Sequence, residues 1–237
     1  MNSTVAHTVR PGDNLYRLAQ TYQTTVESIM ARNQNLDPHN LTIGNTIYIH
    51  AGDNAEKSHP MPDRPEIIEC VLQRDMREMW SQHVFWTRLL LISIAARLKD
   101  EAATTKRLLR NPGDIAAIFA RYFDKADVDA VQKLLTEHLE IGAKLITALR
   151  DRQSRQAEQL NKQWYENAEQ LAEALYMMNP NYDVDMLKAM MRTHLDLTTK
   201  EVVARLAGKY EDDIAAMDDV EREALAMADY LARGILQ

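Results

Sequence analysis

The sequence predicts a small α+β module of β-α-α-β order over residues 1–50, followed by an all-α domain over residues 66–237. Three observations predict this fold class. β-branched runs open and close the first fifty residues, a proline-rich stretch follows them, and the remainder combines helical spacing with an internal period of 55 to 56 residues. Seven glycines and seven prolines in 237 residues are few, which favours helices joined by short turns.

The first fifty residues show strand and helix signals in a fixed order. Residues 7–10 and residues 46–49 alternate and are rich in β-branched side chains, so each run predicts a short strand. Apolar residues follow helical spacing in residues 13–22 and 24–30, which predicts two short helices. Residues 33–40 are rich in Asn, Asp and Pro and predict a loop.

This segment resembles the LysM family, over about a fifth of the chain. The matching residues are His7-Thr8-Val9, Pro11-Gly12-Asp13-Asn14-Leu15, Asn33, Asn35, Leu36, Leu41, Gly44, Ile47 and Ile49. The resemblance implies a shallow groove, between the loop after the first strand and the loop after the second helix, that binds N-acetylglucosamine glycan. Asn14 departs from the family pattern, which has Thr or Ser at that place, and this puts a contact there in doubt.

The resemblance also implies which residues contact the sugar. Loop backbone amides can pair with the amide and hydroxyl groups of an N-acetyl sugar, and its acetyl methyl needs a small apolar floor. We expect Leu15, Ile29 or Leu36 to supply that floor. The alternative is that Gly12, Asp13 and Leu36 serve only as turn, helix cap and core. The full set of expected glycan contacts is Gly12, Asp13, Asn14, Leu15, Ile29, Asn35, Leu36, Asp37 and Pro38.

Residues 51–65 predict a linker between the two parts. The stretch contains three prolines and several charges and is almost without apolar residues. Proline-rich segments of this kind are semi-extended spacers. We therefore expect two separately folded domains.

The remaining residues predict three copies of one helical hairpin, or about six helices. His83, His138 and His194 are 55 and 56 residues apart, and their neighbours four residues before and after also correspond. The segment 111–114, Asn-Pro-Gly-Asp, predicts a helix start that breaks the second helix of the first copy. Residues about 28 positions after the histidines correspond as well, and these are Asn111, Asn167 and Glu223.

The repeated histidines allow two interpretations. Three imidazoles on corresponding helices could converge with Glu223 on a metal ion, so His83, His138, His194 and Glu223 are candidate ligands. Against this, the Glu-x-x-His pairs of di-iron bundles are missing from the sequence. A histidine on an apolar helix face is more often a core residue, hydrogen-bonded across the bundle. We favour this structural interpretation, with Asn111, Asn167 and Glu223 as the partners.

Charge and composition exclude several classes of partner. The net charge of −7 and the lack of a basic stripe exclude a nucleic-acid-binding protein. The most apolar stretch, residues 84–96, is too short for a membrane span and contains Arg88. The first ten residues show no secretory signal, which predicts synthesis in the cytoplasm. The single cysteine, Cys70, allows no disulfide framework and is expected to be buried.

The sequence favours a non-enzymatic adaptor that binds peptidoglycan or a chitin-like glycan. No serine–histidine–aspartate arrangement, P-loop or nucleotide fingerprint occurs in it, so we expect no cofactor. The helical domain would hold a protein partner or self-associate. It weakly resembles uncharacterised all-helical proteins of spore-forming bacteria at residues 76–80, 137–139 and 164–168. That resemblance names a relative and implies no activity. Because some LysM proteins of spore-forming cells also lack a secretory signal and reach the forespore surface, a place in spore or cell-envelope assembly, at the spore or the cell wall, is a hypothesis.

Two other functions stay open at this point. The helical domain could be a metal- or small-molecule-binding bundle, or an enzyme, that the LysM module targets to the wall. A phage-like tail or lysis component is the third option, because LysM modules also occur there.

Overall fold

The protein contains a small α+β unit followed by a helical unit. The computed structural model describes residues 3–10, 13–22, 24–33, 36, 41–42, 44–51 and 64–236. It divides into two compact units, residues 1–62 and 63–237, and each is described here by itself. The predicted fold class is confirmed, with a β-α-α-β order in the first unit and helices alone in the described part of the second.

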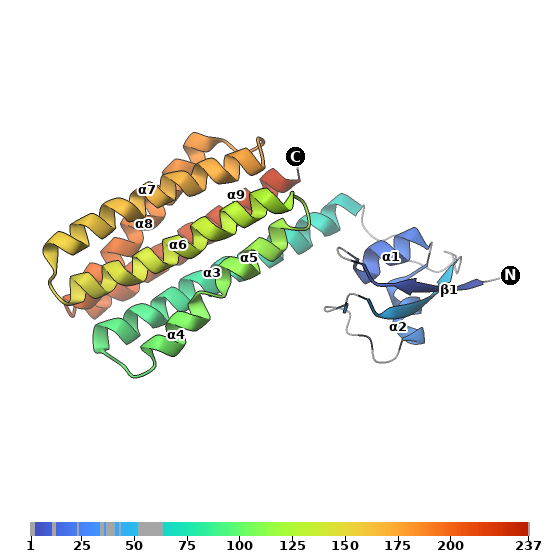
Figure 1. Ribbon diagram of the computed structural model, residues 1–237, viewed down its shortest axis with the longest axis horizontal. Coiled ribbons are helices and arrows are strands. Elements are labelled where there is room, and N and C mark those ends of the chain that lie inside the picture. The colour runs from blue at the N-terminus through green and yellow to red at the C-terminus, as the bar shows by residue number, and fades with distance from the viewer. Residues whose placement is uncertain are drawn as a thin grey trace. The chain divides into compact units, whose positions relative to one another are not determined.

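The first unit has two antiparallel strands and two short helices (Figure 1). The strands pair from Ser3 with Ala51 to Thr8 with Thr46, so the first strand begins earlier than the alternation at His7 indicates. The hydroxyl of Thr25 caps the second helix by accepting a hydrogen bond from the Ser28 amide at 3.1 Å. The elements are β1 (Ser3–Thr8), α1 (Leu15–Thr21), α2 (Val26–Arg32) and β2 (Thr46–Ala51).

The core of this unit lies between the sheet and the two helices. Strand β2 shows the expected two-residue period, because Ile47 and Ile49 are buried while Tyr48 between them is exposed. The buried apolar side chains are Val9, Leu15, Leu18, Ala19, Ile29, Ile47 and Ile49.

The second unit has seven helices over residues 64–236, arranged as three hairpins (Figure 1). In the first hairpin one long helix, α3, packs against two short helices, α4 and α5. The second half of this hairpin is therefore interrupted, as the helix start at residues 111–114 predicts. The next two hairpins are α6 with α7 and α8 with α9. The elements are α3 (Arg64–Ala96), α4 (Glu101–Leu108), α5 (Asn111–Phe119), α6 (Lys125–Arg150), α7 (Ser154–Met178), α8 (Val184–Leu206) and α9 (Tyr210–Ile235).

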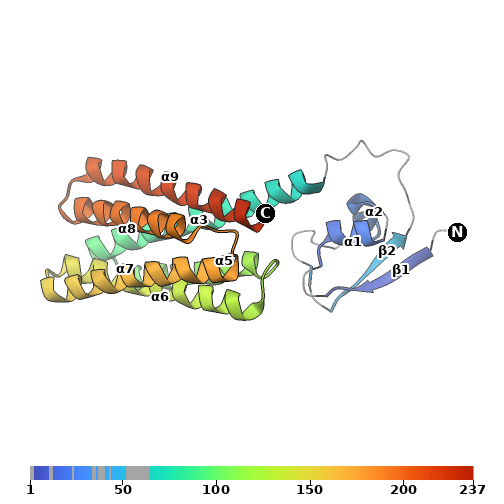
Figure 2. The same cartoon turned by 90° about the horizontal axis from the view of Figure 1, so that it is seen from above.

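The three hairpins close into a ring. Helix α5 packs on α6, α7 packs on α8, and α9 packs on α3, so the second helix of each hairpin contacts the first helix of the next. The first helices α3, α6 and α8 also contact one another, within the bundle that Figures 1 and 2 show from two sides. Over the part of the chain that the structure describes, no helix is both long and apolar enough to cross a membrane.

The structure places the helix ends and corrects the prediction for Cys70. Asn111 is the first residue of α5 and makes no cap hydrogen bond. Gly234 lies inside α9 against the Tyr182 ring. Gly208 does follow α8 with a positive φ of 72°. Asp183 starts α8 by accepting hydrogen bonds from two backbone amides. Cys70 is exposed and not buried.

The predicted linker is shorter than expected at both ends. Ala51 belongs to β2, and Pro65 is the second residue of α3. Residues 52–63, which make up most of the predicted linker, lie outside the described residues.

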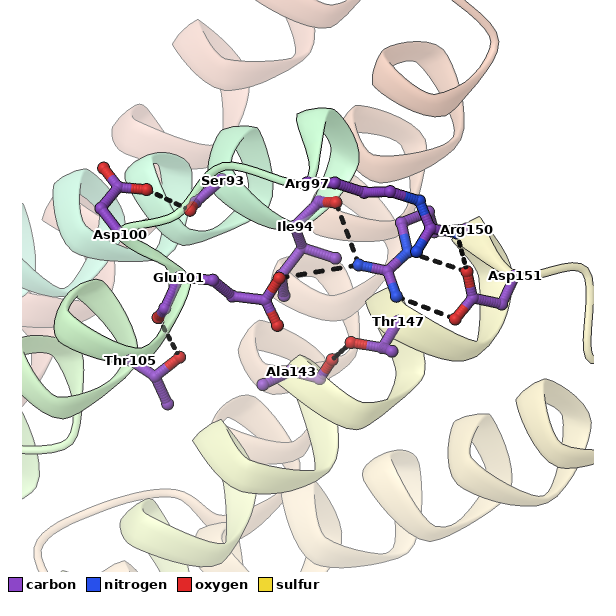
Figure 3. A network of polar contacts seen from close by, with 10 residues as sticks. All are labelled: Ser93, Ile94, Arg97, Asp100, Glu101, Thr105, Ala143, Thr147, Arg150 and Asp151. Atoms are coloured by element: carbon purple, nitrogen blue, oxygen red, sulfur yellow. Dashed lines mark hydrogen bonds and ion pairs between the residues drawn. The ribbon is translucent and has the colours of Figure 1, made fainter.

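A polar network ties the end of α3 to the end of α6 (Figure 3). The Arg150 guanidinium donates to both carboxylate oxygens of Asp151, at 2.9 and 2.8 Å, and to the Ile94 carbonyl at 3.2 Å. Arg97, at the end of α3, donates to the same Asp151 carboxylate at 2.6 Å. The hydrogen bond from Arg150, with the nearby charge of Arg97, lowers the pKa of Asp151 to about 2.

Candidate functional site

The loop after β1 is held in place by the Asp13 carboxylate. His7 on β1 places its Nε2 2.6 Å from Asp13 Oδ2, and the Arg10 amide donates to the same oxygen at 2.8 Å. The other ring nitrogen of His7 lies 2.9 Å from the Tyr22 hydroxyl at the end of α1. Burial raises the pKa of Asp13, but the hydrogen bonds from His7 and Arg10 outweigh it, so this pKa lies below its usual value.

The loop after α2 is anchored by the Asn33 side chain. Its Nδ2 donates to the Ile29 carbonyl at 2.7 Å and to the Tyr48 carbonyl at 2.9 Å. Its Oδ1 accepts a hydrogen bond from the Tyr48 amide at 3.0 Å. Asn33 therefore fixes the end of α2 to β2, at the point where the second expected contact loop begins.

The described glycan candidates differ in exposure. Leu15 and Ile29 are core residues with exposed fractions of 3% and 0%, so their side chains offer no surface to a ligand. Leu36 is half-buried and packs against that core, and Asn14 is exposed. The remaining candidates Gly12, Asn35, Asp37 and Pro38 lie outside the described residues.

The segment that contains the β-α-α-β order and the two anchored loops also matches a known family. Residues 7–50 match the LysM domain model. The LysM match begins inside β1 at His7 and runs to His50, so it includes both helices and both loops. Searches among curated proteins and among solved structures return no match to the chain. The LysM domain is thus the part of the chain with an assigned family.

In the helical unit, each repeated histidine bonds to a residue on the second helix of its own hairpin. The Nδ1 atom of His83 lies 3.0 Å from Asn111 Oδ1, and that of His138 lies 2.9 Å from Asn167 Oδ1. The Nδ1 atom of His194 lies 3.0 Å from Glu223 Oε2. These are the partners that the sequence analysis expected for buried structural histidines.

The three histidines also come together across hairpins. The His194 ring centroid lies 5.8 Å from that of His83 and 6.4 Å from that of His138. All three line one cavity of about 30 Å³ in the centre of the helical unit. Its other walls are apolar, and they include Trp80, Phe119 and Met191.

The candidate metal ligands converge only in part. Glu223 bonds to His194 and does not line the cavity. Within the described residues, no three His, Cys, Asp or Glu side chains are grouped so that they could hold a metal ion. The metal interpretation therefore gains no support from this arrangement.

Two of the histidines are held in the neutral form. Burial, reinforced by the charge of His194 and opposed by the hydrogen bond to Asn111, lowers the pKa of His83 to about 4. Burial and the neighbouring histidines lower the pKa of His138 to about 3. The Trp164 ring lies against His138, with centroids 5.3 Å apart, and adds to the exclusion of water.

The helical unit also contains a buried ion cluster that the sequence did not predict. Arg88 on α3 donates to Glu201 on α8 at 2.7 Å and to both carboxylate oxygens of Asp213 on α9. Arg205 also lies 3.3 Å from Asp213, so two cations meet two carboxylates. The one available signal was Arg88 itself, a charge within an otherwise apolar helical run. The cluster joins three helices at one end of the ring.

Proposed function

We propose that this protein binds N-acetylglucosamine glycan of the peptidoglycan or chitin type through its LysM domain and acts as a non-enzymatic adaptor. The observation that carries the proposal is the LysM match over residues 7–50. The Asp13 and Asn33 anchors support it, because loops that are already held in place lose less conformational entropy when a sugar binds.

The proposed groove lies between the two anchored loops. Leu36 is the apolar candidate with some exposed surface, so we assign it the floor for the acetyl methyl. Gly12, Asn14 and residues 35–38 provide backbone amides and polar side chains for the sugar's amide and hydroxyl groups. Asp13 is a positioning residue, since its carboxylate is engaged by His7 and Arg10.

The adaptor role rests on the division into two units. The helical unit is compact by itself, and its three hairpins bury their apolar faces within the ring. We propose that it holds a second protein, or a second copy of the chain, at the cell wall or spore surface. Internal repetition of one hairpin fits this role, because it builds a stable scaffold from a short unit.

Retention of the full chain on insoluble peptidoglycan and chitin tests the sugar site. We expect retention of the wild type and a several-fold loss with Leu36→Ala, which removes the proposed floor. The matched control is Met177→Ala, which removes an apolar side chain that is 72% exposed on α7 of the helical unit. That variant should be retained like the wild type. A wild-type chain that passes both polymers unretained would refute the proposal.

A further inference from the structure

The outer side of α3 carries an apolar stripe. Phe85, Leu89 and Ile92 recur at the spacing of one helix face. Phe85 is 53% exposed, and the other two side chains are half-buried. Arg88 stands on the same face and donates to both carboxylate oxygens of Asp213, so this face of α3 meets α9. The stripe therefore runs along the contact between the two helices and is partly open to solvent.

Helix α9 extends the apolar stripe. Tyr210 and Ile214 lie one turn apart on it and are 58% and 57% exposed. Ile214 lies about four turns before Asp229, on the same side of α9. Asp229 accepts a hydrogen bond from Arg77 of α3 at 2.7 Å, so this side of α9 borders α3. The residues that we call the α3–α9 surface are Phe85, Leu89, Ile92, Tyr210 and Ile214.

The corresponding positions of the other two hairpins carry charged residues. Two positions after the three repeated histidines stand Phe85, Glu140 and Asp196, and six positions after them stand Leu89, Lys144 and Lys200. On α6, Lys144 Nζ lies 3.8 Å from Glu140 Oε2 as an ion pair. On the second helices, Ile214 corresponds to Glu158 of α7. Since the other hairpins fold with charges at these positions, the fold itself does not require apolar residues on the α3–α9 surface. Exposed apolar patches instead mark sites that bind a partner.

Unpaired carboxylates border the α3–α9 surface. Glu78 stands on the same face of α3 as the apolar stripe, and Asp218 and Glu221 stand on the same side of α9 as its exposed apolar residues. All three side chains are exposed, and none forms an ion pair with a Lys or Arg side chain among the described residues. The nearby Arg77 and Arg88 are already bonded to carboxylates of α9. The surface is therefore apolar in the middle and negative at its edge.

We propose that the α3–α9 surface binds a basic amphipathic helix of a partner protein. The apolar side of such a helix packs on Phe85 and Ile214, and its Lys or Arg side chains meet the bordering carboxylates. Opposite charges at the edge favour this occupant, whereas two copies of the chain joined through the same surface would bring carboxylates against carboxylates. The surface is the second binding site of the adaptor, and it rests on that part of the proposed function.

Binding of a labelled synthetic helix to the full chain, measured by fluorescence anisotropy, tests the proposal. The probe carries leucine at the a and d positions of its heptads and lysine elsewhere. We expect it to bind the wild type and to bind Phe85→Gln and Ile214→Gln about tenfold more weakly, because each change removes apolar area that binding buries. The matched control is Met186→Gln, which makes an apolar residue of α8 that is 50% exposed polar, and it should leave the affinity unchanged.

A second synthetic helix, with glutamate in place of lysine, tests the charge of the partner. It should not bind. Glu221→Gln should weaken binding of the lysine helix several-fold, whereas Glu158→Gln, the same change at an exposed position of α7, should not. A lysine helix that fails to bind, that binds Phe85→Gln as tightly as the wild type, or that binds no better than the glutamate helix would overturn the proposal.

Sedimentation of the full chain alone separates a partner protein from self-association. We expect Phe85→Gln to leave the oligomeric state of the chain unchanged. A dimer that this variant dissociates would assign the surface to a second copy and overturn the proposal. Retention of Phe85→Gln on peptidoglycan should equal that of the wild type, which keeps this test separate from the sugar site.

Discussion

At the scale of single residues, the partner of each histidine decides what the histidine does. His138 is buried and His83 is half-buried, each faces an amide, and the loss of contact with water lowers the pKa of both rings. His7 in the LysM domain faces the Asp13 carboxylate and so positions a loop. The same side chain is thus a core group in one unit and a loop anchor in the other.

The buried histidines predict that acid destabilises the helical unit. In the unfolded chain a histidine takes up its proton near pH 6.5, while folded His83 and His138 do so only at about pH 4 and about 3. Between these values the unfolded state binds more protons, so the free energy of unfolding falls as pH falls from about 7 towards 4. Below the folded pKa values this contribution no longer changes.

Urea unfolding followed by tryptophan fluorescence at pH 7, 6 and 5 measures this effect. All three tryptophans lie in the helical unit, so the signal reports on that unit alone. A His138→Gln variant, which lacks one of the two titrating rings, should show a shallower loss of stability with falling pH. Stability that is constant or rises on acidification over this range would contradict the assignment of neutral buried rings.

At the scale of elements, apolar periodicity predicted the helices well and their ends poorly. The NPGD segment did predict the break before α5, but its first residue Asn111 turns its side chain to His83 and Met79 instead of capping. Gly234 stands inside α9, where the close Tyr182 ring leaves no room for a Cβ. The roles of Asn111 and Gly234 depend on contacts with residues that are distant in the sequence, and local sequence patterns do not reveal such contacts.

Two helical glycines therefore predict opposite effects of the same substitution. A Cβ at Gly142 of α6 would lie 3.5 Å from the Trp164 ring, an ordinary contact, so Gly142→Ala should stabilise the helical unit by about 0.5–1 kcal/mol. A Cβ at Gly234 of α9 would lie 2.1 Å from Tyr182 Cε1, so Gly234→Ala should destabilise it by about 1–3 kcal/mol. Denaturant midpoints of the two variants provide the comparison. Equal effects of the same sign would show that packing around these glycines is described wrongly.

At the scale of the whole molecule, the proline-rich composition of residues 51–65 predicts two domains that fold independently. A protease site introduced within residues 52–63 should therefore release two pieces that each melt cooperatively. Uncut protein at the same pH is the control, and its tryptophan-detected transition should have the same midpoint as that of the released helical piece. Loss of cooperative melting in either piece after cleavage would mean that the two units depend on each other.

The sequence predicted some residues of the histidine cluster and of the candidate glycan site. The features that it did not predict have physical causes. The spacing of 55 and 56 residues identified the three histidines and their partners, because equivalent positions in a hairpin bring the same residues into contact. It did not predict that the rings share one cavity, which depends on closure of the ring by α9 on α3. In the LysM domain the family pattern named Leu15 as a contact, and the need for an apolar floor suggested Ile29, but only the packing shows that both are buried.

Calorimetric titration of the full chain with N-acetylglucosamine oligomers tests the central claim most directly. A groove that spans several sugars should bind longer oligomers more tightly, so affinity should rise from the dimer to the hexamer. Glucose oligomers of the same lengths lack the acetamido group and should give no measurable heat. Absence of heat with the N-acetylglucosamine hexamer, or equal binding of the glucose hexamer, would contradict glycan recognition by this LysM domain.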